Sequence, residues 1–269
     1  LEAQSLTAAQ PSAPNATSGG GGSVASESAK LNALLPTPRP VSGVTAAAAE
    51  SALATSGVRG SGTKIATDGR AEAELIAREQ KLYQPKTYSG PPTKVSLFGS
   101  PAAEGRSFVF VLDRSASTGG QGLGILDAAQ EQLVKVVAEL GPTHRFQIIA
   151  YNQKPHYLGP QQMTLATVEN KPLVAKFFQT VGAYGSTDHE MALRMALKAA
   201  PDVIFLMTDG GDPFLTPYEI RRIVEIAGGK TTIHGIQFGR GEAIPEGAAF
   251  MQRLASETGG SYTFVDANR

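Results

Sequence analysis

Three oxygen-bearing side chains, Asp113, Ser115 and Ser117, stand at alternate positions directly after an apolar run at 108–112. An apolar run of this length predicts a buried strand, and the three oxygens would converge where that strand ends. Hard divalent cations prefer oxygen ligands, and Mg²⁺ in particular is held by few protein groups while it keeps several waters. The pattern therefore indicates a cation site at this point of the chain.

Two further oxygen ligands are expected to join them. Thr187 precedes a predicted helix, and Asp209 follows the apolar run 202–207. In doubly wound folds, ligands sit at the carboxyl ends of the strands where the strand order reverses. In the common strand order the strands 107–112 and 202–207 are neighbours, so we expect Asp113 and Asp209 to meet at one sheet edge.

The elements that must position these side chains begin at Lys94, where apolar runs start to alternate with amphipathic segments. The expected strands are 94–98, 107–112, 145–152, 202–207, 231–238 and 262–265, with a hairpin-like return around 156–158. The expected helices are 124–140, 167–181, a helix from after Thr187 to Ala200, 216–227 and 247–257. Such a pattern implies a mostly parallel sheet with helices on both faces. The predicted fold class is α/β, a doubly wound, Rossmann-like domain.

Residues 1–93 have a different composition, rich in Ala, Ser, Gly and Pro and poor in large apolar side chains. Short helices could form at 44–55 and 68–83. Neither has enough apolar area to fold alone, so a disordered segment is preferred. We therefore divide the chain into a low-complexity linker, 1–93, and a globular domain, 94–269.

The overall composition excludes several classes of function. The chain has 24 basic and 24 acidic residues, so no global field attracts nucleic acid or a membrane surface. It has no cysteine, which excludes disulfides, thiolate metal sites and a cysteine nucleophile. No stretch approaches the ~20 consecutive apolar residues that span a bilayer, so residues 1–269 are not expected to insert into a membrane.

The sequence alone does not assign a cellular location or an oligomeric state. A hydrophobic anchor upstream of Leu1 would make the linker an external stalk, whereas without one the protein would be cytoplasmic.

The complete oxygen set resembles the metal-ion-dependent adhesion site of von Willebrand factor type A domains, in the form found in bacterial proteins. The matching residues are Asp113, Ser115 and Ser117, Thr187 within 185–188, and Asp209 within 208–210. The order of the elements also matches, and the resemblance covers about 94–269.

The resemblance implies a role for each position. Ser115, Ser117 and Thr187 would offer hydroxyl oxygens to the cation, while Asp113 and Asp209 would coordinate it directly or through water and orient the hydroxyls. The expected cation is Mg²⁺, with Mn²⁺ or Ca²⁺ as alternatives. Because neutral hydroxyls leave the cation partly uncompensated, an open position would attract an Asp or Glu carboxylate from a partner protein.

Three positions depart from the common family pattern. Ala116 and Ser186 stand where glycine is frequent, and Thr118 stands where methionine is frequent. None of these changes removes a ligand, so cation binding remains the expectation, while the shape presented to a partner is left open.

Each part of the site also has an ordinary structural interpretation. Residues 113–117 could form a polar turn that caps the next helix, Thr187 and Glu190 could form a capping box, and Asp209-Gly210 is a common turn dipeptide. Their coincidence at one sheet edge favours the cation site.

The enzyme motifs are incomplete. The glycine-rich segment 119–124 does not keep the register of a dinucleotide-binding loop, so loop flexibility is its expected role. The helix that begins at His189 lacks the second histidine of a zinc protease, because Leu193 takes its place. A position of His189 on the helix surface is preferred, with contact to the metal loop as the alternative. His234 falls within a predicted strand and is expected to be buried and hydrogen-bonded.

The leading hypothesis is a non-enzymatic, divalent-metal-dependent protein-binding module of the adhesion or scaffold type. The alternative is a metal-dependent phosphoester hydrolase, which would use Asp113 and the same cation and would need His189 as general base. A structural module within a larger assembly is a third hypothesis.

Overall fold

The computed structural model describes residues 73–74, 76–78, 81 and 88–268. The chain divides into two units, Leu1–Lys64 and Ile65–Arg269, and all of the described residues belong to the second. The described residues between 73 and 81 are helical and fall within the helix considered at 68–83. The helix considered at 44–55 lies outside the described residues.

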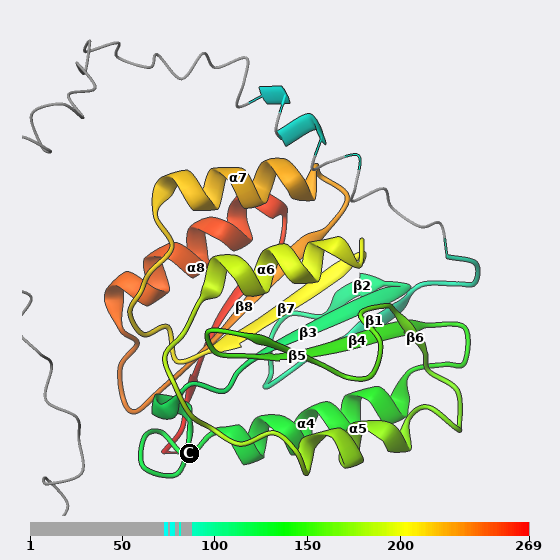
Figure 1. Ribbon diagram of the computed structural model, residues 1–269, viewed down its shortest axis with the longest axis horizontal. Helices are drawn as coiled ribbons and strands as arrows, with labels where there is room; N and C mark the ends of the chain where they lie inside the picture. Colours follow the sequence, from blue (N-terminus) through cyan, green and yellow to red (C-terminus); the bar gives the residue numbers. More distant parts are fainter. Residues whose placement is uncertain (1–72, 75, 79–80, 82–87, 269) are drawn as a thin grey trace, which may run out of the picture. The chain divides into compact units, whose positions relative to one another are not determined.

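A mostly parallel sheet forms the centre of this unit (Figure 1). Its strands are β3 (Ser107–Asp113), β4 (Arg145–Tyr151), β5 (Pro155–Tyr157), β6 (Thr164–Leu165), β7 (Val203–Thr208), β8 (Thr232–Gly239) and β9 (Tyr262–Asp266). The order is β5-β4-β3-β7-β8-β9, and β6 also pairs with β4. Only β5 and β6 run antiparallel to β4, while the pairs among β4, β3, β7, β8 and β9 are parallel.

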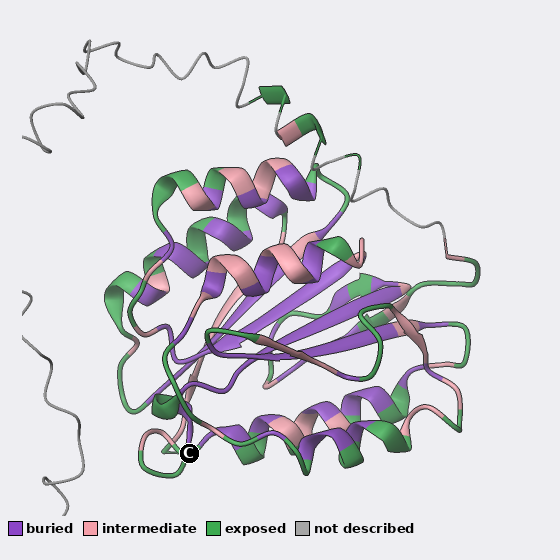
Figure 2. Cartoon of the chain, in the orientation of Figure 1, coloured by how far each residue is buried: buried purple, intermediate pink, exposed green. Residues whose placement is uncertain are grey.

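Helices cover both faces of the sheet, as the sequence predicts (Figure 1). They are α4 (Leu126–Glu139), α5 (Pro172–Phe178), α6 (His189–Lys198), α7 (Pro217–Ala227) and α8 (Pro245–Thr258). Alternate residues of a strand face opposite sides, and Phe108 and Phe110 pack with α4 and α5 while Val109 and Val111 pack with α6, α7 and α8. Every residue of β3 is therefore buried (Figure 2).

Several elements differ from the sequence-based expectation, among them β6, a short strand that the sequence did not predict. The strand expected at 94–98 is β1 (Thr93–Val95), and it pairs with an unexpected strand, β2 (Ala103–Gly105), outside the main sheet. The helix expected at 167–181 is only α5, because Pro172 has no N–H to continue a helical ladder from the residues before it. The start of the helix expected at 124 moves to Leu126, after Gly124 in the left-handed region at φ 68°.

No helix among the described residues is long and apolar enough to cross a membrane.

Candidate metal site

The two aspartates lie at neighbouring strand ends. β3 ends at Asp113 and β7 ends at Thr208, and the two strands are parallel with Leu112 opposite Met207. The Thr208 hydroxyl donates a hydrogen bond to Asp113 Oδ2 at 2.6 Å and lies 3.5 Å from Asp209 Oδ1. The structure thus brings Asp113 and Asp209 together through one shared hydroxyl, at the sheet edge where the sequence analysis expected them.

The loop after β3 holds the two serines. Asp113 Oδ1 accepts a hydrogen bond from the Ser115 backbone N–H at 2.8 Å, and the Ser115 and Ser117 hydroxyl oxygens are 3.1 Å apart. Ser115 precedes a short 3₁₀ helix, Ala116–Thr118, but its side chain does not cap that helix. Residues 113–117 therefore form a polar turn, but the serine hydroxyls do not cap the following helix.

Thr118 fixes the shape of this loop. Its side chain is buried, and its hydroxyl donates to the Ser115 carbonyl at 2.8 Å. The residue that replaces the frequent methionine therefore bonds directly to the backbone of a candidate ligand.

The capping box suggested for Thr187 is wrong. Asp188 is the N-cap of α6, where its Oδ1 accepts from the Met191 N–H at 2.9 Å, and Glu190 pairs with Arg194 and Arg222 at 3.7 and 3.9 Å. Within the described part of the chain, the Thr187 hydroxyl has no hydrogen-bond partner. This buried threonine is therefore available as a ligand.

The loop that carries Thr187 is attached to its neighbours. The Ala116 N–H donates to the Gly185 carbonyl at 3.0 Å, and the Asp188 N–H donates to the Asn152 carbonyl at 3.1 Å. Thr187 thus lies between one contact to the serine loop and one to the end of β4.

Asp209 lies in a tight turn, as its sequence neighbours suggest. Asp209 Oδ1 accepts from the Gly211 N–H at 3.0 Å, while the Gln237 side chain donates to the Asp209 carbonyl at 3.2 Å. Gly210 has a φ of 71°, and a Cβ there would lie 2.6 Å from Gln237 Nε2, so the turn requires glycine.

The charge balance of the site favours a cation. Asp113 and Asp209 are 1% and 5% exposed, and no Lys, Arg or His of the described segments forms an ion pair with either. Burial raises the pKa of Asp113 above its usual value, against the opposing effect of the Thr208 hydrogen bond. Buried carboxylates without a counter-charge are costly, and a divalent cation would remove that cost. The donor set, two carboxylates and three hydroxyls, fits a hard cation such as Mg²⁺.

The described residues contain no group of three or more His, Asp or Glu side chains that could hold a metal. The expected ligand set accordingly includes the hydroxyls of Ser115, Ser117 and Thr187 in addition to the two carboxylates.

His189 is buried, so its expected position on the helix surface is wrong. The ring is 1% exposed, its Nε2–H donates to the Gly211 carbonyl at 3.3 Å, and its Nδ1 accepts from the Tyr151 hydroxyl at 2.8 Å. Burial lowers the pKa of His189. The ring joins the start of α6, two residues after Thr187, to the loop after Asp209, a role that helical periodicity could not reveal. The sequence signal for this role was the position of His189 two residues after the candidate ligand Thr187.

His234 is placed as the sequence predicts, and His144 lies away from the site. His234 is buried in β8, with Nδ1 2.9 Å from the Ser261 hydroxyl. His144 precedes β4, at the opposite edge of the sheet from Asp113, and its Nε2 lies 3.1 Å from the Pro91 carbonyl.

The glycine-rich loop packs tightly against the site. A Cβ on Gly122 would lie 1.9 Å from the Ser117 carbonyl, and the Leu123 N–H donates to that carbonyl at 2.7 Å. Close backbone approach, rather than the expected flexibility, is the role of glycine at position 122.

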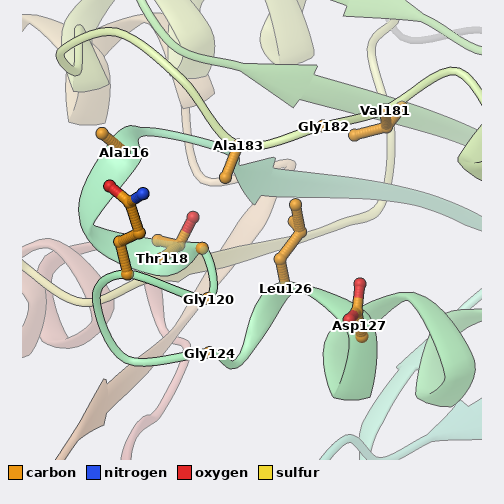
Figure 3. Close-up of a pocket in the computed structure, with 11 residues that line it drawn as sticks. Ala116, Thr118, Gly120, Gly124, Leu126, Asp127, Val181, Gly182 and Ala183 are labelled. Atoms are coloured by element: carbon orange, nitrogen blue, oxygen red, sulfur yellow. The ribbon is translucent and has the colours of Figure 1, made fainter. Parts of the chain in front are cut away.

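A cavity of about 550 Å³ is lined in part by this loop. In Figure 3 the loop through Gly120 and Gly124 and the start of α4 face the segment 181–183. Ala116 also lines it, so the cavity adjoins the serine loop.

Comparisons with known proteins agree with this fold. A family model described as the von Willebrand factor type A domain matches residues 107–264. A solved von Willebrand factor type A structure from Catenulispora acidiphila has a TM-score of 0.53 and 20% identity, and the match covers 62% of this chain and 40% of that one. A comparison with curated proteins finds no match.

Two other solved structures are more distant. Proximal thread matrix protein 1 from the mussel byssus, with a zinc-occupied MIDAS motif, has a TM-score of 0.47 and 18% identity over 66% of this chain and 45% of that one. The manganese-loaded TRAP protein of Plasmodium vivax has a TM-score of 0.38 and 17% identity over 66% of this chain and 74% of that one.

The family match and the Catenulispora structure support the same fold. The Catenulispora structure supports the fold, and the chain spans 40% of its length. The family match begins at the first residue of β3 and ends within β9, so it includes both strand ends that carry the aspartates and covers more than half of the chain. This chain therefore belongs to the von Willebrand factor type A domain family.

Proposed function

We propose that this protein is a divalent-metal-dependent protein-binding module whose cation, Mg²⁺ or alternatively Mn²⁺ or Ca²⁺, captures a carboxylate of a partner protein. The residues proposed to hold it are Asp113, Ser115, Ser117, Thr187 and Asp209. The observation that carries the proposal is the pair of buried carboxylates of Asp113 and Asp209, which share the Thr208 hydroxyl and form no ion pair with a Lys, Arg or His of the described residues.

Each residue contributes through its own contacts. The Thr208 hydroxyl and the Ser115 N–H orient the Asp113 carboxylate, and the Gly211 N–H orients Asp209. The hydroxyls of Ser115, Ser117 and Thr187 add oxygen atoms without adding negative charge. When bound, the cation supplies a positive centre that attracts an anionic oxygen. A partner with an exposed Asp or Glu meets this requirement.

The arrangement of His189 supports a binding function over the hydrolase considered as the alternative. A general base must reach the proton that it abstracts. Both ring nitrogens of His189 are engaged, one with Tyr151 and one with Gly211, and the ring is buried. The base that the hydrolase would require is therefore not free.

Isothermal titration of the full chain with Mg²⁺ and Mn²⁺ tests the proposal. We expect the wild type to bind either cation and Asp113→Asn to lose binding, since the variant keeps the shape of the side chain without its charge. Asp127→Asn is the matched control, because Asp127 is exposed at the start of α4, and it should bind as the wild type does. A wild type that does not bind, or an Asp113→Asn variant that binds normally, would refute the metal assignment.

A further inference from the structure

Next to the candidate metal site lies a buried arginine whose charge is not neutralised. Arg114 is 5% exposed, and its Nε has no hydrogen-bond partner among the described residues. Its Nη1 makes one long hydrogen bond, 3.4 Å, to the Gly182 carbonyl. Within the same described residues no Asp or Glu pairs with it. A buried cation in this state is unusual, because its charge is normally compensated by an anion.

Tyr184 covers this arginine and faces solvent. The Arg114 guanidinium lies 4.4 Å from the centre of the Tyr184 ring, a cation–π contact, and the tyrosine is 58% exposed. The Tyr184 N–H donates to the Arg114 carbonyl at 2.9 Å, and the next residue, Gly185, accepts from the Ala116 N–H. The pair is therefore fixed to both loops that carry the candidate hydroxyl ligands.

Lys154 adds a second positive charge to the same place. It is exposed in the turn after β4, where its N–H donates to the Asn152 side chain at 3.0 Å. The amide group of Asn152 in turn donates to the Tyr184 carbonyl at 2.9 Å. A hydrogen bond from the Arg114 side chain, the charge of Arg114 and, to a smaller extent, the charge of Lys154 lower the pKa of Tyr184.

The balance of charge indicates what this surface would bind. The carboxylates of Asp113 and Asp209 can balance a divalent cation, whereas no Asp or Glu of the described residues forms an ion pair with Arg114 or Lys154. His156, whose pKa burial and Arg114 both lower, adds no charge at neutral pH. One partner carboxylate at the cation would still leave the neighbouring surface positive.

We propose that Tyr184, Lys154 and the buried Arg114 form a second anion-binding position beside the metal site, so that the partner is an acidic protein segment presenting two carboxylates. The first carboxylate occupies the metal site, and this part of the inference rests on the proposed function. The second accepts hydrogen bonds from the Tyr184 hydroxyl and the Lys154 ammonium group, while Arg114 behind the ring supplies a fixed positive field. Charge-assisted hydrogen bonds of this kind are stronger than neutral ones.

Synthetic peptides test this directly on the Mg²⁺-loaded full chain. One capped glycine peptide carries a single glutamate, and a series carries a second glutamate one to four positions away. Affinity is measured by calorimetry, with and without EDTA. We expect at least one member of the series to bind about fivefold tighter than the single-glutamate peptide, with an advantage that falls as salt increases.

The variants locate the second position. The double variant with Lys154→Ala and Tyr184→Phe should lose the advantage of the second glutamate while it keeps its Mg²⁺ affinity and its affinity for the single-glutamate peptide. The matched control, Lys135→Ala with Tyr218→Phe, changes an exposed lysine on α4 and an exposed tyrosine on α7 and should keep the advantage.

The outcomes separate this inference from the proposed function. If the single-glutamate peptide binds only without EDTA and no second glutamate improves it, the second position is refuted and the proposed function stands. If the second glutamate helps equally in the Lys154 and Tyr184 double variant, the position lies elsewhere and the inference is wrong. If no peptide shows EDTA-sensitive binding, the proposed capture of a carboxylate fails, and the second position fails with it.

Discussion

Thr187 shows how one neighbouring residue decides what a side chain can do. Asp188 caps α6, so the helix does not need the Thr187 hydroxyl. The sequence Thr187-Asp188-His189-Glu190 is compatible both with a capping box and with a metal ligand at Thr187. Only the backbone conformation at Asp188 distinguishes the two.

Thr187→Ala should therefore weaken metal binding without destabilising the fold. We expect a loss of about tenfold or more in Mg²⁺ affinity, at least the effect typical of losing a supporting residue at a metal site. Asp188→Ala should behave in the opposite way, with a loss of about 1 kcal/mol in unfolding free energy from the missing cap. Calorimetry and urea unfolding in EDTA measure the two effects. A Thr187→Ala variant that unfolds more easily than Asp188→Ala would show that the hydroxyl has a structural role.

The sequence predicted the positions of the two aspartates at neighbouring strand ends better than it predicted their surroundings. Asp113 and Asp209 follow short apolar runs, which the sequence analysis interprets as buried strands. His189 and Arg114 have no such signal, because their burial depends on loops that are distant in sequence. The ring of His189 reaches the loop after Asp209, and the Arg114 side chain packs under Tyr184.

At the scale of elements, the fold follows from the same apolar runs. β3 and β7 are buried on both faces, so their sequences are continuously apolar and their neighbouring positions in the sheet are predictable. The short strands β1 and β2 carry no such pattern. Their pairing depends on contacts between separate chain segments, and the sequence predicts only β1.

The glycine-rich loop offers a test at this scale. Gly122→Ala would place a methyl group against the Ser117 carbonyl, which must then move, so we expect weaker Mg²⁺ binding and a loss of roughly 1–3 kcal/mol in stability. Gly120→Ala is the matched control, because a Cβ there meets nothing within 4 Å. Calorimetry and urea unfolding distinguish the variants. Equal behaviour of the two would contradict the close packing of this loop on Ser117.

At the scale of the whole molecule, the pH dependence of stability should include a contribution from His234. Burial lowers the pKa of His234 below its usual 6.5, and its ring nitrogens contact the Ser261 and Thr232 hydroxyls. The unfolded chain therefore binds a proton more readily than the folded one. This contribution is fully present above pH 6.5 and is lost as the pH falls toward the folded-state pKa.

His234→Gln isolates that contribution. The other titrating groups are common to both proteins, so the difference between them reports on His234 alone. We expect the unfolding free energy of the wild type, measured by urea in EDTA, to fall more between pH 7.5 and 5.5 than that of the variant. A variant with the same or a larger fall would contradict the assignment.

We propose that the ends of β3 and β7 and the loop before α6 share one cation, and paramagnetic broadening by Mn²⁺ can locate that cation. In ¹⁵N spectra of the full chain at neutral pH, a small fraction of one equivalent of Mn²⁺ should broaden the amide signals of Ser115, Ser117, Thr187 and Gly210 first. Those of Lys135 and Glu257, on α4 and α8, serve as the distant reference. Excess Mg²⁺ should restore the broadened signals. Broadening centred on any other part of the molecule, or no broadening at all, would contradict a cation shared by these three segments.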